Sequence, residues 1–449
     1  MDGSDYDAII MGTGLTECLL SGLLSVNKYK VLHLDRNPYY GASCASVTLS
    51  TVFNKYKNML NTKMETLGKD RDYNIDLVSK FLMANGKLMK MLRMCGVTKH
   101  HIEFTLVQGS YVLKGSKLHK VPASAPEALK SSLVGMFEKR KLQKFMMFAT
   151  DFKPYDPNDQ STFKNKKYLD MNMAELFKSF KLKPNTIDFL GHAVALYPSE
   201  EYLTKQTATQ GLKKIGLYTT SFSRYGTSPY IYPLYGLGEL PQVFSRFCAV
   251  HGGTFMLAQS VDGVEYDDNT GVVNKVTNGD DQYATCKFVV ADPSYFPKKV
   301  KKVGEVVRAI CILNHPVPNT ADAPSVQIIL PQKQTGRKHD CYVTVTSYQH
   351  KVAKKGYYLA LISTTVETGD PEKELIPVFK LLGNISAQFI YTTPVHQILD
   401  DGSKSKVFIS KDYDASTHFE GVCADILDMF KRITGKDLDL EKDFVQAED

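Results

Sequence analysis

The sequence predicts an α/β protein with three parts: a main domain, an antiparallel β subdomain and an all-helical insertion. Three observations lead to this prediction. Near the N-terminus, a turn with two glycines joins an apolar run to an apolar helical pattern, as in a βαβ unit. Positions 123–223 carry helical patterns, and four β-rich runs follow one another between positions 306 and 367.

The turn has the sequence Gly12-Thr13-Gly14-Leu15-Thr16-Glu17, and the next apolar run ends at Asp35. In a Rossmann unit an acid at this place binds a ribose, and a third glycine lets helix and strand pack closely. Glu17 replaces that third glycine, so it adds bulk and negative charge where a pyrophosphate would lie. The pattern therefore predicts a flavoprotein-like, Rossmann-type main domain with a degenerate nucleotide turn.

Two interpretations of Glu17 remain open. Its carboxylate, stabilised by the helix dipole by roughly 0.3–1 kcal/mol, can take the electrostatic place of the missing phosphate. The turn can also be an ordinary βα connection, in which Gly14 begins the helix and Glu17 caps it. No flavin or nicotinamide cofactor is expected with either interpretation.

The predicted elements follow in chain order. The first part of the main domain covers residues 1–122, with helices near 54–70 and over 76–95 and a strand-like end at 117–122. The insertion, 123–223, has helical patterns within 127–152, at 173–180 and at 186–196, joined by the loop-like stretch 153–167. The main domain resumes over 224–292, where glycines and prolines predict a loop at 224–241. After it come a helix to position 250, a strand at 254–257, two hairpin turns, and a strand at 287–293 that returns to the parallel sheet.

The last two parts are the β subdomain and the C-terminal end of the main domain. The subdomain covers residues 293–388, with strands expected at 307–313, 326–330, 342–346 and 357–365. Helical segments are expected near 372–391. The end, 389–449, has a strand at 407–410 and a helix at 419–433 with Gly435 as its C-cap.

Composition excludes several classes of function. The 449 residues are 43% apolar and 23% charged, which is typical of a globular protein, and the net charge of +7 is modest for this size, with short basic runs that do not imply nucleic acid. The eight cysteines form no CxxC pair, so we expect free thiols rather than disulfides or a zinc site. No HExxH or GxSxG motif is present, the N-terminus is acidic, and no apolar stretch reaches the length of a membrane span. We therefore expect a cytoplasmic protein without a catalytic or metal site.

Seven stretches carry a resemblance to a known family: 11–20 (MGTGLTECLL), 34–41 (LDRNPYYG), 80–86 (KFLMANG), 135–139 (GMFEK), 228–241, 309–320 (AICILNHPVPNT) and 412–420 (DYDASTHFE). In these stretches, which run in family order over essentially the whole chain, the sequence closely resembles the Rab GDP dissociation inhibitors. The resemblance implies a regulatory binding protein that binds GDP-loaded, geranylgeranylated Rab GTPases. Such a protein slows GDP release, extracts the GTPase from membranes and carries it through the cytosol.

The resemblance also implies site residues. The Rab-binding platform of the family falls here on Tyr40, Glu239, Arg246, Thr254 and Met256, and the mobile effector loop on Arg224, Tyr225, Ser228 and Tyr230. The helical domain of the family holds the prenyl group, and candidate lining residues here are Val134, Phe137, Phe145, Ile187, Leu190 and Val194. Taken alone, Met256 and the apolar residues at helical spacing are more typical of core positions than of a binding site.

Two departures from the family pattern concern these sites. Ala42 stands where the family commonly has a second glycine, and Thr227 where it has a lysine. The implied partners are Rab GTPases in the GDP form, their geranylgeranyl lipid and, transiently, a membrane, with a monomer forming a 1:1 complex. Two alternatives are a Rab escort-like factor, which would support Rab prenylation, and a flavin-dependent oxidoreductase, which would be coloured when purified.

Overall fold

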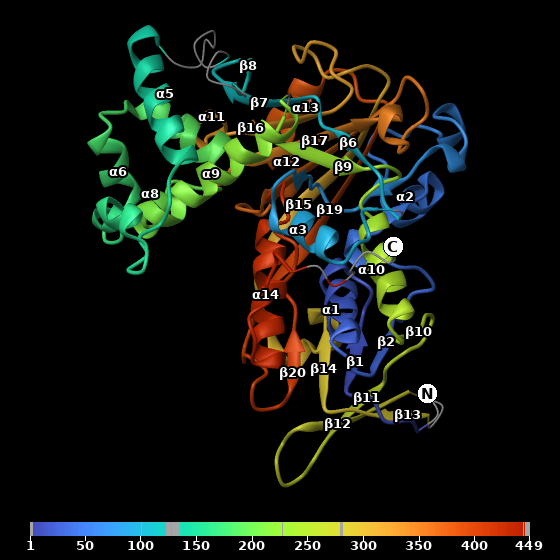
Figure 1. The fold of residues 1–449 in the computed structure, drawn as a ribbon. Coiled ribbons are helices and arrows are strands. Elements are labelled where there is room, and N and C mark those ends of the chain that lie inside the picture. Colours follow the sequence, from blue (N-terminus) through green and yellow to red (C-terminus); the bar gives the residue numbers. More distant parts are fainter. Residues whose placement is uncertain are drawn as a thin grey trace.

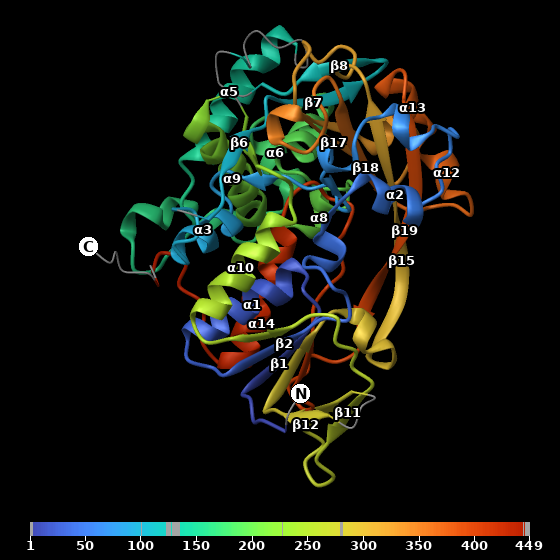
Figure 2. The ribbon, with the colours of Figure 1, turned by 90° about the vertical axis from the view of Figure 1, so that its right-hand side faces the viewer.

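The computed structural model describes residues 3–99, 101–122, 127, 135–226, 228–278, 282–442 and 444. Figures 1 and 2 show a parallel sheet with its helices at one end of the molecule and a larger sheet above it. The helices of residues 136–225 project to one side of the larger sheet (Figure 1). The α/β class predicted from the sequence is confirmed.

The parallel sheet is the core of the main domain. Its strands follow the order β10 (Thr254–Met256), β2 (Val31–Leu34), β1 (Ala8–Met11), β14 (Phe288–Ala291) and β20 (Val407–Ile409), and all four pairings are parallel. One face packs against α1 (Leu15–Val26), α10 (Glu239–Val250) and α14 (Glu420–Thr434), as Figure 1 shows.

A small antiparallel sheet contributes to the core on the other face: β11 (Gly263–Tyr266), β12 (Val273–Thr277) and β13 (Tyr283–Thr285). With both faces covered, β1, β2, β14 and β20 are buried at every position, as expected of parallel strands.

The larger sheet has seven strands. Their order is β19 (Ala387–Ile398), β15 (Val300–Leu313), β18 (Tyr358–Thr365), β17 (Cys341–Ser347), β16 (Val326–Leu330), β7 (Gly109–Lys114) and β8 (Lys117–Lys120). All neighbours are antiparallel except β16 and β7. The four predicted strands of the β subdomain are therefore confirmed as β15 to β18. The sheet also takes β7 and β8 from the first part of the chain and β19 from the last, so its pairing extends beyond residues 293–388.

The segment from 135 to 226 is helical in the part that the structure describes. It contains α5 (Met136–Thr150), the 3₁₀ helix η4 (Gln160–Tyr168), α6 (Met173–Ser179), α7 (Pro184–Phe189), the π-helical turn η5 (Leu190–Val194), α8 (Tyr202–Lys205) and α9 (Ala208–Tyr225). We call residues 135–226 the helical segment below. The 153–167 stretch, predicted as a loop, instead includes most of η4.

Short strands and helices connect these units. They are β3 (Ser46–Val47), α2 (Leu49–Lys55), β4 (Ile75–Asp76), β5 (Leu82–Met83), α3 (Lys87–Met94), β6 (Phe104–Leu106), β9 (Tyr230–Pro233), α11 (Gln332–Thr335), α12 (Pro371–Glu374) and α13 (Ile376–Leu382), with 3₁₀ turns at Ala42–Cys44, Met64–Thr66, Asp70–Asp72, Pro293–Tyr295, Pro297–Lys299 and Tyr348–His350. Pairing joins β3 to β4, and β5 and β6 to β9.

Four sequence predictions are wrong in this connecting structure. The helix expected over 76–95 begins only at Lys87, because β4 and β5 come before it. The stretch near 54–70 is mostly irregular, with only the end of α2 and short 3₁₀ turns, the helical stretch near 372–391 gives way to β19 from Ala387, and the loop expected at 224–241 contains β9. Each of these strands is held by a partner distant in sequence, such as Phe104–Leu106 for β9, which local periodicity does not reveal.

All eight cysteines are buried free thiols, as predicted. Among the described residues, no helix is long and apolar enough to cross a membrane, and no group of histidine, cysteine and acidic side chains could hold a metal ion.

Candidate functional site

An open hollow of about 510 Å³ lies beside the edge of the parallel sheet, and three of the predicted platform residues line it. Tyr40 comes from the loop after β2, while Glu239 and Arg246 come from α10. Glu239 is in the first turn of α10 and Arg246 is seven residues later, so both project from one face of the helix. The remaining lining residues are His101, Gln242, Val243, Ser245, Ala249, Gly253 and Phe255.

The hollow combines an aromatic, an acidic and a basic group. Tyr40 is half-buried and meets Phe255 edge-on, with the ring centroids 6.0 Å apart. Burial raises the pKa of the Glu239 carboxyl above its usual range, although its place in the first helical turn favours the charged form. The Arg246 side chain is exposed. These are the groups that a protein partner can contact through both apolar and charged interactions.

The backbone after Tyr40 explains how its side chain is positioned. Gly41 has a φ of +106°, and a Cβ there would lie 2.8 Å from the Cα of Ala45, so only glycine fits. Ala42 follows with a φ of +45°, in the left-handed region that L residues adopt at a cost of about 1 kcal/mol. The Ala42 backbone is therefore accommodated with some strain.

Thr254 and Met256 are not part of this hollow. They lie on the edge strand β10, where side chains alternate between the two faces of the sheet. Phe255, the residue between them, points to the opposite face and lines the hollow. Met256 packs against the core cluster on the other face of the sheet, and Thr254 is exposed. Sequence reasoning missed Phe255, although its alternation with Thr254 and Met256 could have indicated it.

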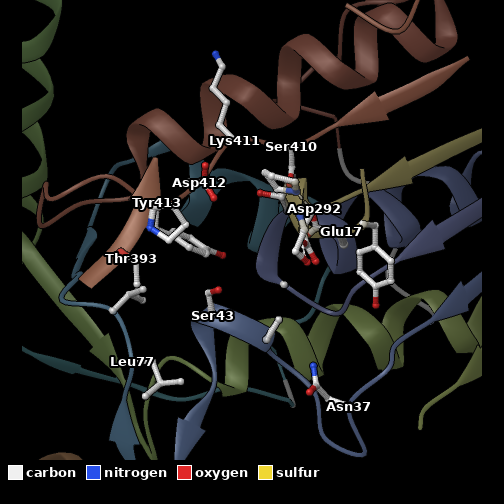
Figure 3. Close-up of a pocket in the computed structure, with 18 of the residues that line it drawn as sticks. Glu17, Asn37, Ser43, Leu77, Asp292, Thr393, Ser410, Lys411, Asp412 and Tyr413 are labelled. Carbon is white, nitrogen blue, oxygen red and sulfur yellow. Dashed lines mark hydrogen bonds between the residues drawn. The ribbon is translucent and has the colours of Figure 1, made fainter. Parts of the chain in front are cut away.

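A second cavity, of about 380 Å³, adjoins the glycine turn (Figure 3). Gly14 is the N-cap residue of α1, and the Glu17 side chain turns back over it: a Cβ on Gly14 would lie 2.5 Å from Glu17 Oε2. The hydroxyl of Ser410 donates to Glu17 Oε1 at 2.5 Å. Figure 3 shows Glu17, Asp292 and Ser410 together at one end of the cavity.

Burial, and then the neighbouring Asp292 carboxylate, raises the pKa of Glu17 to about 8. At neutral pH the Glu17 side chain is therefore mainly protonated. The expectation that its negative charge takes the place of a phosphate is wrong, because a carboxyl group that is 3% exposed loses the hydration that favours its ionised form. The bulk of the side chain at the turn remains.

The residues at this turn do not fit a dinucleotide. The Glu17 and Asp292 carboxyls lie within 2.6 Å of where Cβ atoms on Gly14 and Gly12 would be, in the space that a diphosphate needs. Asp35 Oδ2 accepts from the Thr13 backbone amide at 2.7 Å and from its hydroxyl, and Oδ1 accepts from Asn37. Since protein donors already use both oxygens of Asp35, a ribose would have to displace them.

Three of the four residues assigned to the predicted mobile loop lie in regular elements. Arg224 and Tyr225 form the last turn of α9, which ends at Gly226 with a φ of +78°. Ser228 is buried, and Tyr230 is a fully buried residue of β9. Arg224 and Tyr225 are exposed, so the structure separates an accessible end of α9 from a buried strand. Thr227 lies outside the described residues.

The prenyl candidates that the structure describes lie in the helical segment and its core. Phe145, Leu190 and Val194 are buried in the main hydrophobic cluster, and Ile187 is partly buried against it. The Phe145 ring packs with Phe177 and Phe180 at 5.5 and 5.1 Å. Leu190 and Val194 share the π-helical turn η5. Val134, and the side chain of Phe137, lie outside the described residues.

Comparisons with known proteins identify the family. The family described as GDP dissociation inhibitor matches residues 1–444. The chain is 47% identical over 439 residues to Rab GDP dissociation inhibitor beta of Rattus norvegicus. This alignment covers 98% of the present chain and 97% of the rat protein. A crystal structure of a Rab GDI from Plasmodium falciparum matches with a TM-score of 0.90 at 41% identity, covering 98% of this chain and 100% of that one.

More distant structures share the fold. An oxidoreductase from Methanosarcina mazei matches with a TM-score of 0.60 at 12% identity, over 95% of this chain and 100% of the other. A putrescine oxidase matches with a TM-score of 0.55 at 9% identity, over 96% and 99%. The predicted flavoprotein-like architecture is thereby confirmed, as fold alone. With the family match over nearly the whole length, the chain belongs to the GDP dissociation inhibitor family, whose members are regulatory binding proteins rather than enzymes.

Proposed function

We propose that this protein is a Rab GDP dissociation inhibitor that binds GDP-loaded, geranylgeranylated Rab GTPases as a monomer in a 1:1 complex. It slows GDP release, extracts the GTPase from membranes and recycles it through the cytoplasm. The observation that carries the proposal is the hollow lined by Tyr40, Glu239 and Arg246, in a chain that is 47% identical to a rat protein named for this activity.

The platform would contact the GTPase from two sides of β10. Tyr40, Glu239 and Arg246 line the hollow on the helix side, whereas Thr254 is exposed on the other face. Because β10 is the edge strand of the sheet, a partner lying across that edge can contact both the residues of the hollow and Thr254. An aromatic anchor next to an exposed arginine is a common composition for the centre of a protein interface.

The helical segment would hold the lipid. Ile187 is partly buried beside the enclosed Leu190 and Val194, so it is the described candidate through which a prenyl chain could enter the core. Burying an isoprenoid contributes about 0.8 kcal/mol per carbon, but the membrane interior offers nearly the same. Extraction therefore depends on the free energy of the protein–protein contact at the platform.

The two alternatives are less well supported. The carboxyls at the glycine turn argue against a flavin-dependent oxidoreductase, so we propose a binding protein on a degenerate flavoprotein fold. An escort-like role is less well supported, because the alignment spans 97% of the rat inhibitor and 98% of this chain.

The test is a binding experiment with prenylated Rab loaded with either GDP or a GTP analogue. We expect the purified protein to retain the GDP form and to release it from liposomes into solution, with much weaker retention of the GTP-analogue form. Equal binding of both nucleotide states would contradict the proposal. Stimulation of Rab prenylation by a prenyltransferase would instead support the escort-like alternative.

A further inference from the structure

The net charge of the chain is concentrated in the helical segment. Residues 135–226 contain fifteen lysine and arginine residues against nine aspartate and glutamate residues, a net charge of +6 out of +7 for the whole chain. This segment lies to one side of the molecule, away from the parallel sheet (Figure 1). The remaining residues are close to neutral, so the segment is the basic end of the protein.

Within the segment, the buried and exposed residues of η4 lie on different faces of the helix. A 3₁₀ helix has three residues per turn, so positions three apart share a face. Thr162, Asn165 and Tyr168 are buried, while the residues between them form two outward faces. One face carries Phe163, Lys166 and Leu169, and the other carries Ser161, Lys164 and Lys167. All six are exposed, and Phe163 is 48% exposed.

Contacts on the buried face hold η4 in one orientation. The Asn165 side-chain amide donates to the Lys153 carbonyl at 2.7 Å, and the Thr162 hydroxyl donates to the Asp159 carbonyl at 2.7 Å. The Tyr168 ring packs against Phe148 and Phe152 of the α5 region, with centroids 5.4 and 5.8 Å away. The outward faces are therefore presented by a helix that is anchored to the core of the segment.

The three outward lysines have no acidic partner among the described residues. Lys166 and Lys167 lie over aromatic rings, with the Lys166 Nζ 5.8 Å from the Tyr155 centroid and the Lys167 Nζ 4.9 Å from the Tyr168 centroid. None of the three lysines is in an ion pair in the part of the chain that the structure describes. Their charge is available to an external anion.

We propose that the outward faces of η4, formed by Phe163, Lys164, Lys166, Lys167 and Leu169, are a surface that binds anionic membranes. Lysines next to an exposed phenylalanine and leucine match a lipid interface, where ammonium groups meet acidic headgroups and apolar side chains enter the acyl boundary. A purely acidic protein partner would use the lysines but would leave Phe163 and Leu169 in water. The inference rests on the proposed function, which brings the protein to membranes, and it assigns the surface that makes contact.

Sedimentation with vesicles that contain no GTPase tests this surface. We expect the wild-type protein to bind phosphatidylcholine vesicles more tightly when they contain phosphatidylserine, and added salt should weaken that binding. Replacing Lys164, Lys166 and Lys167 by glutamine should lower the partition coefficient by about a hundredfold at moderate salt, since each lysine near an anionic surface accounts for about fivefold. The double variant Phe163→Ala/Leu169→Ala should lower it by roughly tenfold at any salt concentration.

The matched control removes the same charge elsewhere. Lys298, Lys301 and Lys302 are exposed residues at and near the start of β15, outside the helical segment. Their replacement by glutamine should leave vesicle binding within about twofold of the wild-type value at moderate salt, because charges beyond a Debye length of about 10 Å contribute little. An equal loss in both triple variants would show that net charge matters and would overturn the assigned surface.

Two further measurements separate the possible failures. The η4 triple variant should bind GDP-loaded Rab in solution as tightly as the wild type, because η4 is remote from the platform hollow in sequence and shares no lining residue with it. Unchanged vesicle binding by this variant would overturn the assignment of η4 as the membrane-binding surface and would leave the proposed function intact.

Loss of binding to an acidic peptide, with vesicle binding intact, would identify a protein partner for η4 and would also overturn the membrane assignment. Failure of the wild-type protein to bind GDP-loaded Rab would overturn the proposed function itself.

Discussion

The Glu17 carboxyl lies over the glycine turn that precedes α1, with the Ser410 hydroxyl on one of its oxygens and Asp292 nearby. Its pKa of about 8 compares with about 4.5 in an unfolded chain. Between these two pH values the folded protein holds a proton that the unfolded protein has lost. Stability therefore falls as the pH rises from 4.5 to 8, and the full cost of ionising Glu17 is present above pH 8.

Replacing Glu17 by glutamine should make the protein more stable at alkaline pH than the wild type. Glutamine keeps the shape and can accept the hydrogen bond from Ser410, but it has no group to ionise. The increase in the free energy of unfolding over the wild type should be small at pH 5 and on the order of 4 kcal/mol at pH 9. Urea unfolding at the two pH values measures it, with Glu372→Gln as a control at an exposed glutamate. A difference between variant and wild type that does not change with pH would contradict the assigned pKa.

At the scale of elements, α10, β10 and the loop after β2 form the platform hollow. Only part of the predicted set shares it: Tyr40, Glu239 and Arg246 do, whereas Met256 packs on the other face of β10. The alternation of side chains along a strand decides this separation. Three contiguous positions, 254–256, therefore contribute to two different surfaces.

Replacing Tyr40 or Arg246 by alanine should weaken binding to GDP-loaded Rab while leaving the melting temperature nearly unchanged. Tyr40 is half-buried and Arg246 exposed, so neither truncation opens a cavity in the core. Loss of an interface anchor typically costs about 2 kcal/mol, which is roughly thirtyfold in affinity. Titration calorimetry and thermal melting measure the two quantities.

Two other exposed residues provide matched controls for these variants. Tyr39 is 42% exposed and lines the other cavity, and Arg93 is an exposed arginine of α3. Alanine at either position should change the Rab affinity by less than about threefold, as expected outside a hot spot. If Tyr40→Ala instead lowers the melting temperature strongly and leaves the affinity intact, the role of Tyr40 is to stabilise the fold.

At the scale of the whole molecule, the proposed function divides between the platform and the helical segment. The platform would recognise the GTPase, and the helical segment would remove the lipid from water. Damage to the two parts should therefore have different consequences in binding and in extraction.

A charged residue in place of Ile187 should abolish extraction of prenylated Rab from liposomes and leave binding of unprenylated GDP-Rab measurable. The Ile187 side chain is partly buried against the core. An unpaired charge at this apolar position would disfavour binding of a prenyl chain beside it. The variant Ile187→Glu is compared with Asn185→Glu, at an exposed position of the same helix, which should extract normally. Extraction at the wild-type rate by a folded Ile187→Glu protein would show that the lipid binds elsewhere. Loss of both activities would show that the two parts are not independent.

The sequence by itself determined the α/β class, the glycine turn with Glu17, the four strands β15 to β18, and the family resemblance. These features are local: a buried parallel strand is a continuous apolar run, and a turn needs its glycines whatever lies around it. The helices α6 and α14, and the C-cap at Gly435, were predicted within a few residues for the same reason.

Only the tertiary structure decided the remaining features, because each depends on groups that are distant in the chain. The strand at Tyr230–Pro233 exists through its pairing with Phe104–Leu106, so a segment rich in glycine and proline is strand rather than loop. The protonation of Glu17 results from burial beside Asp292, which lies 275 positions away in the sequence. Phe255 was found in the hollow, and Met256 outside it, only once β10 was placed at the edge of its sheet. Local patterns specify elements, whereas pairing, burial and desolvation depend on how those elements are packed together.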